Sequence, residues 1–437
     1  MRRAFIGATI ALLVVACGTE PTIQVPSTQL PAPAPSPVIP EIVITVVART
    51  AQAKIIIPTP TPEPGKWENG PALLNGRSGH IAVKLNDGRV LVAGGGRPSG
   101  LARVPGGTII GFIGNQSGAG IANAEILDRG LNVWSSTSPM NIARINATAT
   151  LLGDGTVLVV GGENSGGVPL NSAEIFDPAT GKWQLVGSMA SPRAVHTATQ
   201  LPDGTVIVVG GLQRIPGEAA GSHTTVEIFD PATGEWSNGP ELIADKSNIT
   251  SDRFLHDAIL IGNTHLLVVG GVNADGVQYN FLQTVLMLDI ESMEWAFTEP
   301  ANSRRSSTRL AVLPDGRILS AGGADQNPRS ETFDPESGEW TTTKASAAIR
   351  QDHQIAVLPD GRVMAIGGRS GFRTLDSVEF FSPADDTWTV GPPMSERRLG
   401  ATATMLNDRR ILVAGGASSS RGSASVTSRS VEIYSLN

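Results

Sequence analysis

The sequence predicts an all-β protein built from seven copies of one four-stranded unit. Three observations lead to this prediction: a double glycine recurs seven times, a tight-turn residue precedes each pair at a fixed distance, and all seven Trp share one repeat position. Short apolar runs separate these features, and no long stretch keeps the 3.6-residue periodicity of an amphipathic helix. Self-similarity at a period of about 50 residues indicates a repeat architecture.

Each double glycine ends an apolar run such as 157–160, which has the composition of a buried strand. Seven residues earlier stands a turn residue, most often followed by glycine, as expected for a tight β-hairpin. One strand therefore turns back into the strand that ends at the double glycine. The pairs are Gly94-Gly95, Gly161-Gly162, Gly210-Gly211, Gly270-Gly271, Gly322-Gly323, Gly367-Gly368 and Gly415-Gly416. The turn residues are Asp87, Asp154, Asp203, Asn263, Asp315, Asp360 and Asp408.

A third strand of each unit contains an acidic residue, and a Trp begins the fourth strand. In one unit Glu174 to Asp177 forms the third strand, and Trp183 follows Asp177 by six residues. The same spacing separates the Asp-like position from Trp in every complete unit. The seven Trp are Trp67, Trp134, Trp183, Trp236, Trp295, Trp340 and Trp388.

This order of double glycine, acidic strand and Trp resembles the kelch repeat, and the resemblance covers residues 61–437. It implies four-stranded antiparallel blades that close into a seven-bladed β-propeller. The two chain ends fit closure, because Ser435 occupies the Asp-like position with no Trp after it, and residues 61–67 resume at the equivalent position. We expect the N-terminal strand to complete the last blade, which removes an exposed sheet edge.

Residues 1–16 have the features of a signal peptide. Arg2 and Arg3 precede an apolar run, 4–15, that is too short to span a membrane as a helix. The segment 14–17 resembles the lipobox of bacterial lipoproteins, which implies that Cys17 becomes the first residue of the mature protein and carries a lipid. An ordinary signal peptide is the alternative. Cys17 is the only Cys, so no disulfide can form within the chain.

Residues 17–60 are predicted to comprise the lipidated Cys and a Pro-rich linker. Such a composition cannot form a core and favours an extended stalk. We therefore expect a secreted protein, lipid-anchored at the cell surface or outer envelope. The chain has 33 Lys and Arg against 40 Asp and Glu, and no basic run. This balance argues against nucleic acid as a partner.

The two ends of each blade are expected to differ. The turns between strands 1 and 2 and between strands 3 and 4 form a turn face, where the sequence is short and uniform. The loops between strands 2 and 3 and between blades form a loop face, where length varies, and loops on a rigid scaffold often carry function. The longest loops are about 96–123 and 236–253. We predict that they flank a groove; the alternative is that both are inert elaborations.

An Arg stands seventeen residues before every double glycine, at the entry to the innermost strand. One interpretation is a ring at the channel mouth that binds an anionic ligand through its guanidinium groups. The other is a structural role, in which each Arg pairs with the third-strand acid or with loop carbonyls; Leu286 replaces this acid in the fourth unit. The candidates are Arg77, Arg144, Arg193, Arg253, Arg305, Arg350 and Arg398.

Four histidines share another repeat position and are expected to be structural, because side chains in separate blades cannot converge on one metal. They are His80, His196, His256 and His353.

The repeat spacing is similar to that of galactose oxidase and glyoxal oxidase, which are also seven-bladed kelch proteins. Their copper-radical chemistry needs a Tyr–Cys crosslink, whereas residues 61–437 contain Tyr279, Tyr434 and no Cys, so this chemistry is excluded. A bacterial sialic-acid mutarotase, with six blades, is also a kelch propeller. No nucleophile motif, phosphate loop or metal-ligand spacing is present, and no cofactor is expected.

The leading hypothesis is a monomeric, surface-anchored binding module that recognises a glycan, a peptide or an envelope protein through its loop face. The alternative is a carbohydrate-active enzyme of the mutarotase or lyase type, which would need an acid/base pair in a polar pocket. A third hypothesis is a structural spacer without a ligand. The fold alone does not decide between them.

Overall fold

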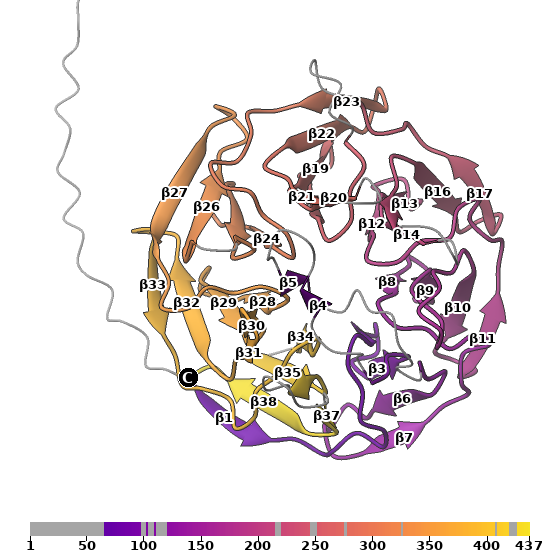
Figure 1. The fold of residues 1–437 in the computed structure, drawn as a ribbon. Coiled ribbons are helices and arrows are strands. Elements are labelled where there is room, and N and C mark those ends of the chain that lie inside the picture. The colour runs from indigo at the N-terminus through magenta and orange to yellow at the C-terminus, as the bar shows by residue number, and fades with distance from the viewer. Residues whose placement is uncertain are drawn as a thin grey trace, which may run out of the picture. The chain divides into compact units, whose positions relative to one another are not determined.

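The computed structural model describes residues 65–97, 102–103, 109–110, 120–214, 220–244, 251–274, 278–324, 327–406, 409–418 and 426–437. All regular elements in these ranges are strands. The prediction of a seven-bladed β-propeller is confirmed, because seven four-stranded antiparallel sheets surround a central opening (Figure 1). The described part of the chain contains no helix with the length and hydropathy of a membrane span.

The blades are numbered in chain order, each from its innermost strand. Blade 1 consists of β2 (Ile81–Lys84), β3 (Val90–Ala93), β6 (Ala124–Leu127) and β7 (Trp134–Ser136). Blade 2 consists of β8 (Thr148–Leu151), β9 (Val157–Val160), β10 (Ala173–Asp177) and β11 (Lys182–Leu185). Blade 3 consists of β12 (Thr197–Gln200), β13 (Val206–Val209), β16 (Val226–Asp230) and β17 (Glu235–Asn238). Blade 4 consists of β18 (Asp257–Ile261), β19 (His265–Val269), β22 (Val285–Asp289) and β23 (Glu294–Phe297).

Blades 5 to 7 continue the pattern. Blade 5 consists of β24 (Arg309–Val312), β25 (Ile318–Ala321), β26 (Arg329–Phe333) and β27 (Trp340–Ala345). Blade 6 consists of β28 (Gln354–Val357), β29 (Val363–Ile366), β32 (Val378–Ser382) and β33 (Thr387–Val390). Blade 7 consists of β34 (Thr402–Met405), β35 (Arg410–Ala414), β38 (Val431–Ser435) and β1 (Lys66–Asn69).

The N-terminal strand closes the ring, as predicted. β1 pairs antiparallel with β38, with Trp67 opposite Tyr434 and Lys66 opposite Ser435. The rings of Trp67 and Tyr434 lie 5.0 Å apart between centroids. Because β38 runs from the loop face to the turn face, the described chain both begins and ends at the turn face.

Repeated side chains seal the seams between blades. The second strand is fully buried in five blades, as its continuous apolar sequence predicts, and in the other two, β19 and β35, its first residue alone is partly exposed. In blade 2, Trp183 packs on Phe176 at 4.9 Å between ring centroids. Its Nε1–H donates to Ser138 O of the preceding blade at 2.9 Å. Five other Trp make the equivalent bond, which explains why every Trp of the chain falls at one position.

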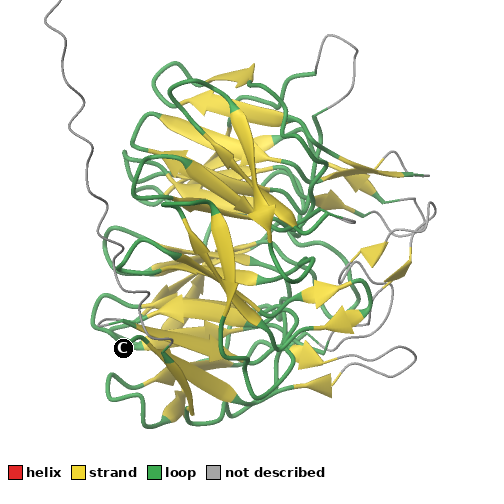
Figure 2. Cartoon of the chain, turned by 90° about the vertical axis from the view of Figure 1, so that its left-hand side faces the viewer, coloured by secondary structure: helices red, strands yellow, loops and turns green. Residues whose placement is uncertain are grey.

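Short two-stranded ribbons extend the loop face in five blades and project from one side of the propeller (Figure 2). In Figure 1 the β4–β5 ribbon projects over the central opening. The ribbons are β4 (Ala102–Arg103) with β5 (Ile109–Ile110), β14 (Leu212–Gln213) with β15 (Gly221–Ser222), β20 (Val272–Ala274) with β21 (Tyr279–Phe281), β30 (Arg369–Ser370) with β31 (Arg373–Thr374), and β36 (Ala417–Ser418) with β37 (Val426–Thr427).

Candidate functional site

The repeated Arg lies inside its own blade. In blade 2, Arg144 Nη1 donates to Gly161 O at 2.8 Å, and Nη2 donates to Glu174 Oε1 at 2.8 Å. Glu174 also accepts the backbone N–H of Asn141 at 2.6 Å. One buried ion pair therefore joins the double glycine, the third strand and the incoming loop.

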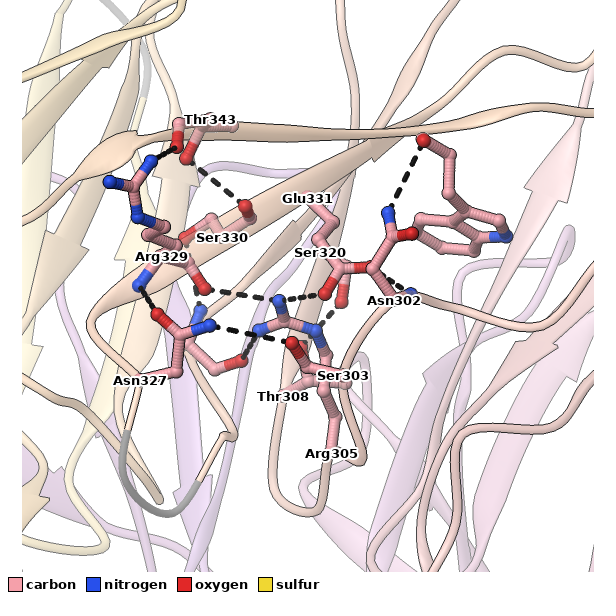
Figure 3. A network of polar contacts seen from close by, with 12 residues as sticks. Asn302, Ser303, Arg305, Thr308, Ser320, Asn327, Arg329, Ser330, Glu331 and Thr343 are labelled. Carbon is pink, nitrogen blue, oxygen red and sulfur yellow. Dashed lines mark hydrogen bonds and ion pairs between the residues drawn. The ribbon is translucent and has the colours of Figure 1, made fainter.

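The same ion pair is present in six blades, as the alternative interpretation of the ring expected. Figure 3 shows it in blade 5, where Arg305 Nη2 meets Glu331 Oε1 at 2.5 Å and Glu331 Oε2 accepts Asn302 N–H. The pairs are Arg77–Glu125, Arg144–Glu174, Arg193–Glu227, Arg305–Glu331, Arg350–Glu379 and Arg398–Glu432.

The ring arginines are not at the channel mouth, where the sequence analysis expected them. All seven are buried, with at most 4% of each residue exposed, and none lines the central cavity described below. The reason is physical: a buried guanidinium must be bonded, and the blade supplies carbonyls and a carboxylate on the side away from the channel. Ligand binding by these residues remains a prediction. None of the seven Arg is exposed in the described structure.

Blade 4 lacks the carboxylate. Leu286 is fully buried at the strand position that Glu occupies elsewhere, and Arg253 bonds only to neutral groups. Its Nη1 donates to Gly270 O at 3.0 Å and its Nη2 to Thr284 Oγ1 at 3.0 Å. Burial lowers the pKa of Arg253 to about 10, while nearby Asp252 acts in the opposite direction.

A polar cavity of about 470 Å³ occupies the centre of the propeller. One repeat position, thirteen residues before each double glycine, contributes a side chain to its wall from every blade. Five of these residues are uncharged, while Asp257 and Arg309 in adjacent blades are charged. The set is Ile81, Thr148, Thr197, Asp257, Arg309, Gln354 and Thr402.

The mouth of this cavity is a ring of residues with left-handed backbone. Their φ values lie between 47° and 63°, even at Val195 and Leu255, where such a conformation is strained. Backbone N–H groups donate to the preceding blade's mouth residue in five of seven steps, for example Leu255 N to Val195 O at 3.1 Å. The mouth residues are Gly79, Asn146, Val195, Leu255, Ser307, Asp352 and Gly400.

The ring is interrupted on both sides of Asp352, in the blade that follows Arg309. Asp352 pairs with Arg369 of its own blade at 2.6 Å. Asp257 accepts Leu310 N–H at 2.8 Å, and burial raises the pKa of Asp257 while the charge of Arg309 opposes that shift. Sequence reasoning missed Asp257 and Arg309, although both depart from a position where three blades have Thr.

The repeated histidines act between blades. Nε2 of His80, His196 and His256 bonds a Thr hydroxyl of the preceding blade at 2.9 to 3.0 Å. His353 differs: neither of its ring nitrogens has a hydrogen-bond partner within the described ranges. Burial and the nearby Arg309 and Arg350 hold the pKa of His353 well below its ordinary value, so the ring is neutral.

Some predictions fall wholly or partly outside the described residues. The signal peptide, Cys17 and the linker lie there entirely. The loops predicted to flank a groove are described only in part, since 98–101, 104–108, 111–119 and 245–250 are not. Among the residues that are described, no three His, Cys, Asp or Glu side chains gather as ligands of one metal ion.

Comparisons with known proteins agree with this geometry. The model of the KLHDC2/KLHL20/DRC7 Kelch-repeats domain matches residues 131–323 and 195–416. A solved structure of a fungal alcohol oxidase of the AA5 family, in complex with copper, is 16% identical with a TM-score of 0.64. The alignment covers 85% of this chain and 76% of the oxidase, and at this identity it shows a shared fold alone. No curated protein sequence matches. Since the family model spans well over half of the chain, the protein belongs to the Kelch-repeat family of β-propellers.

Proposed function

We propose that the protein is a binding module that presents its loop face to a protein partner at the cell envelope. The observation that carries this proposal is the difference between the two faces. Short hairpins stabilised by their own Asp close the turn face, as where Asp154 Oδ1 accepts Thr156 N–H at 2.9 Å. Five ribbons extend the loop face around the cavity mouth. Kelch propellers typically act as protein-interaction scaffolds, which agrees with this assignment.

The ribbons of blades 3 and 4, β14–β15 and β20–β21, together form one surface, which we call the platform. An apolar cluster beneath them includes Leu212, Phe254 and Val272, all at most 1% exposed. Phe254 meets Tyr279 edge-on at 6.3 Å between ring centroids. A surface already ordered before binding loses little conformational entropy when a partner docks, which favours recognition.

A polar network ties the same two ribbons to the loop that enters blade 4. Asp252 accepts hydrogen bonds from Asn273 Nδ2 at 2.5 Å and from the hydroxyl of Ser222. Ser222 Oγ in turn accepts Ala274 N–H at 3.0 Å. These bonds hold the two ribbons and the loop that enters blade 4 together beside the cavity mouth.

The position of the chain ends supports display of the loop face. Gly65, the first described residue, lies at the turn face, next to the start of β1. A linker that runs from a lipid on Cys17 would therefore join the domain on the side opposite the ribbons. This arrangement leaves the loop face free to meet a partner.

The proposal is tested with a photoreactive amino acid placed at one of two exposed valines in the full chain. Val426 is 62% exposed on a loop-face ribbon, and Val133 is 53% exposed on the turn face. Irradiation of intact cells should give a discrete adduct from Val426 and none from Val133. Adducts from Val133 alone, or from both positions equally, would contradict a dedicated loop face.

A carbohydrate-active enzyme is a second candidate, favoured by one observation. Asp257 and Arg309 are adjacent in the wall of the cavity, so a carboxyl with a raised pKa stands beside a cation. Nuclear magnetic resonance exchange between sugar anomers would detect mutarotation. Acceleration by the native chain that Asp257→Asn abolishes would support the enzyme, and equal rates with and without protein would dismiss it.

A further inference from the structure

The wall of the central cavity holds an Arg that forms no ion pair with any described acid. Arg309 lines the cavity and is only partly exposed, and no carboxylate in the described ranges forms an ion pair with it. Its one hydrogen bond is long, from Nη1 to Thr308 O at 3.4 Å. The Arg at the buried ring position instead donate to oxygen atoms of their own blades, as Arg144 does to Gly161 O and Glu174.

Arg309 also leaves a neighbour unsatisfied. In three other seams a Thr at this position bonds Nε2 of the next blade's His, as Thr402 does with His80 at 3.0 Å. Blade 5 presents Arg309 instead, and within the described residues buried His353 has no hydrogen-bond partner for either ring nitrogen. An unbonded buried polar group costs about 1 to 3 kcal/mol. A residue that lowers stability and gains no visible contact is expected where the chain needs it for function.

The groups around Arg309 define the chemistry of a ligand. The guanidinium fork matches a carboxylate. Asp257 is next to it in the wall and can accept hydrogen bonds from hydroxyls, and the Gln354 amide can donate and accept. Hydroxyls of Thr148, Thr197 and Thr402 complete the same ring, and no Phe, Tyr or Trp is among the described residues that line the cavity.

These groups select against simple anions and neutral sugars. A bare anion would meet Arg309 but would face the carboxyl of Asp257 without donating to it. A neutral sugar would donate to Asp257 and leave Arg309 without an ion pair. The volume of about 470 Å³ lies in the range of small-ligand sites, which is roughly 300 to 1,000 Å³.

We propose that the central cavity binds a sugar acid, with the carboxylate at Arg309 and sugar hydroxyls at Asp257 and Gln354. This site is separate from the ribbons of the loop face. A failed crosslink at Val426 would leave it standing, and a failed sugar titration would leave the loop-face proposal standing.

The test is a calorimetric titration of the full chain with D-glucuronate, D-glucose and acetate. We expect glucuronate to bind and the other two to bind at least about tenfold more weakly, since a charge-assisted bond and the hydroxyl contacts are each lost. Arg309→Thr should weaken glucuronate binding by a similar factor. Equal binding of glucuronate and acetate would overturn the proposal, as would no binding of glucuronate.

A matched control variant distinguishes binding by Arg309 in the cavity from a general effect of positive charge on the same face. Arg373 is exposed on the β30–β31 ribbon, so Arg373→Thr removes one positive charge from the same face. It should bind glucuronate as the native chain does. Equal weakening in Arg309→Thr and Arg373→Thr would overturn the site assignment. Thermal unfolding of each variant checks that its fold is intact.

Discussion

His353 is buried with both ring nitrogens unbonded because Arg309 of the preceding blade stands where Thr holds the equivalent His in three other seams. Two further regularities fail at the same seam between blades 5 and 6. Trp388 Nε1 has no partner among the described residues, and the hydrogen-bonded ring at the mouth is interrupted at Asp352. The departures from the repeat are therefore concentrated beside the charged part of the cavity.

The seam between blades 5 and 6 predicts that two Trp contribute differently to the free energy of unfolding. Trp183→Phe should lower the free energy of unfolding by about 1 kcal/mol more than Trp388→Phe, because only Trp183 loses an Nε1 bond to the preceding blade. Both rings pack on a Phe, at 4.9 and 5.3 Å between centroids, so the apolar change is comparable. Denaturant unfolding measures the difference. A larger loss at Trp388 would show that this indole is bonded after all.

The buried ion pairs predict a large loss of stability from a single truncation. Glu174→Ala leaves Arg144 buried without a carboxylate and frees the Asn141 N–H, so the free energy of unfolding should fall by about 3 to 5 kcal/mol. Glu339→Ala, on the exposed turn face, should change it by less than about 0.5 kcal/mol. Chemical denaturation of the two variants gives the comparison. Similar small losses would mean that the ion pair does not hold the blade together.

The buried carboxyl of Glu163, near the cavity mouth, predicts that the free energy of unfolding depends on pH. Glu163 is 4% exposed, and burial raises its pKa to about 7, while Arg214 and Asn146 act in the opposite direction. The folded state therefore favours the protonated form. The contribution of Glu163 to stability is fully present below the pKa of an unfolded Glu, about 4.3, and is lost as the pH rises through 7.

Glu163→Gln removes this titration with little change of shape. The variant and the native chain should unfold with nearly equal free energies at pH 4. At pH 8 the variant should be more stable by about 3 to 4 kcal/mol. Denaturant unfolding at the two pH values tests this, and a native chain that gains stability over the variant as pH rises would show that Glu163 is charged and paired.

The sequence predicted the fold well because each blade solves the same packing problem. Trp183 and its equivalents mark the outer strand, and the double glycines allow the backbone of one blade to pass close to the next: a Cβ at Gly94 would meet Arg144 O of the next blade at 2.6 Å. Closure by β1 followed from the matching ends. Positions that are used in every blade turned out to lie in the blade, as the Arg144–Glu174 pair shows.

The candidate site was harder to predict because it consists of exceptions. Arg305 and Arg309 are four residues apart, yet one is buried in the blade and the other lines the cavity. Between them the backbone turns at Ser307, which has a φ of 52°. A Ser at this position does not by itself predict a left-handed backbone. Arg309 stands where three blades have Thr, but the sequence does not show that this position lines the cavity.

The central claim is that Arg309 serves a ligand at the expense of the seam between blades 5 and 6. The most direct test is the free energy of unfolding of Arg309→Thr without ligand, measured beside the native chain and Arg373→Thr. We predict that Arg309→Thr is more stable than both, because Thr restores the bond to His353 Nε2 that three other seams contain. A less stable Arg309→Thr would show that Arg309 supports the fold, and the account would be contradicted.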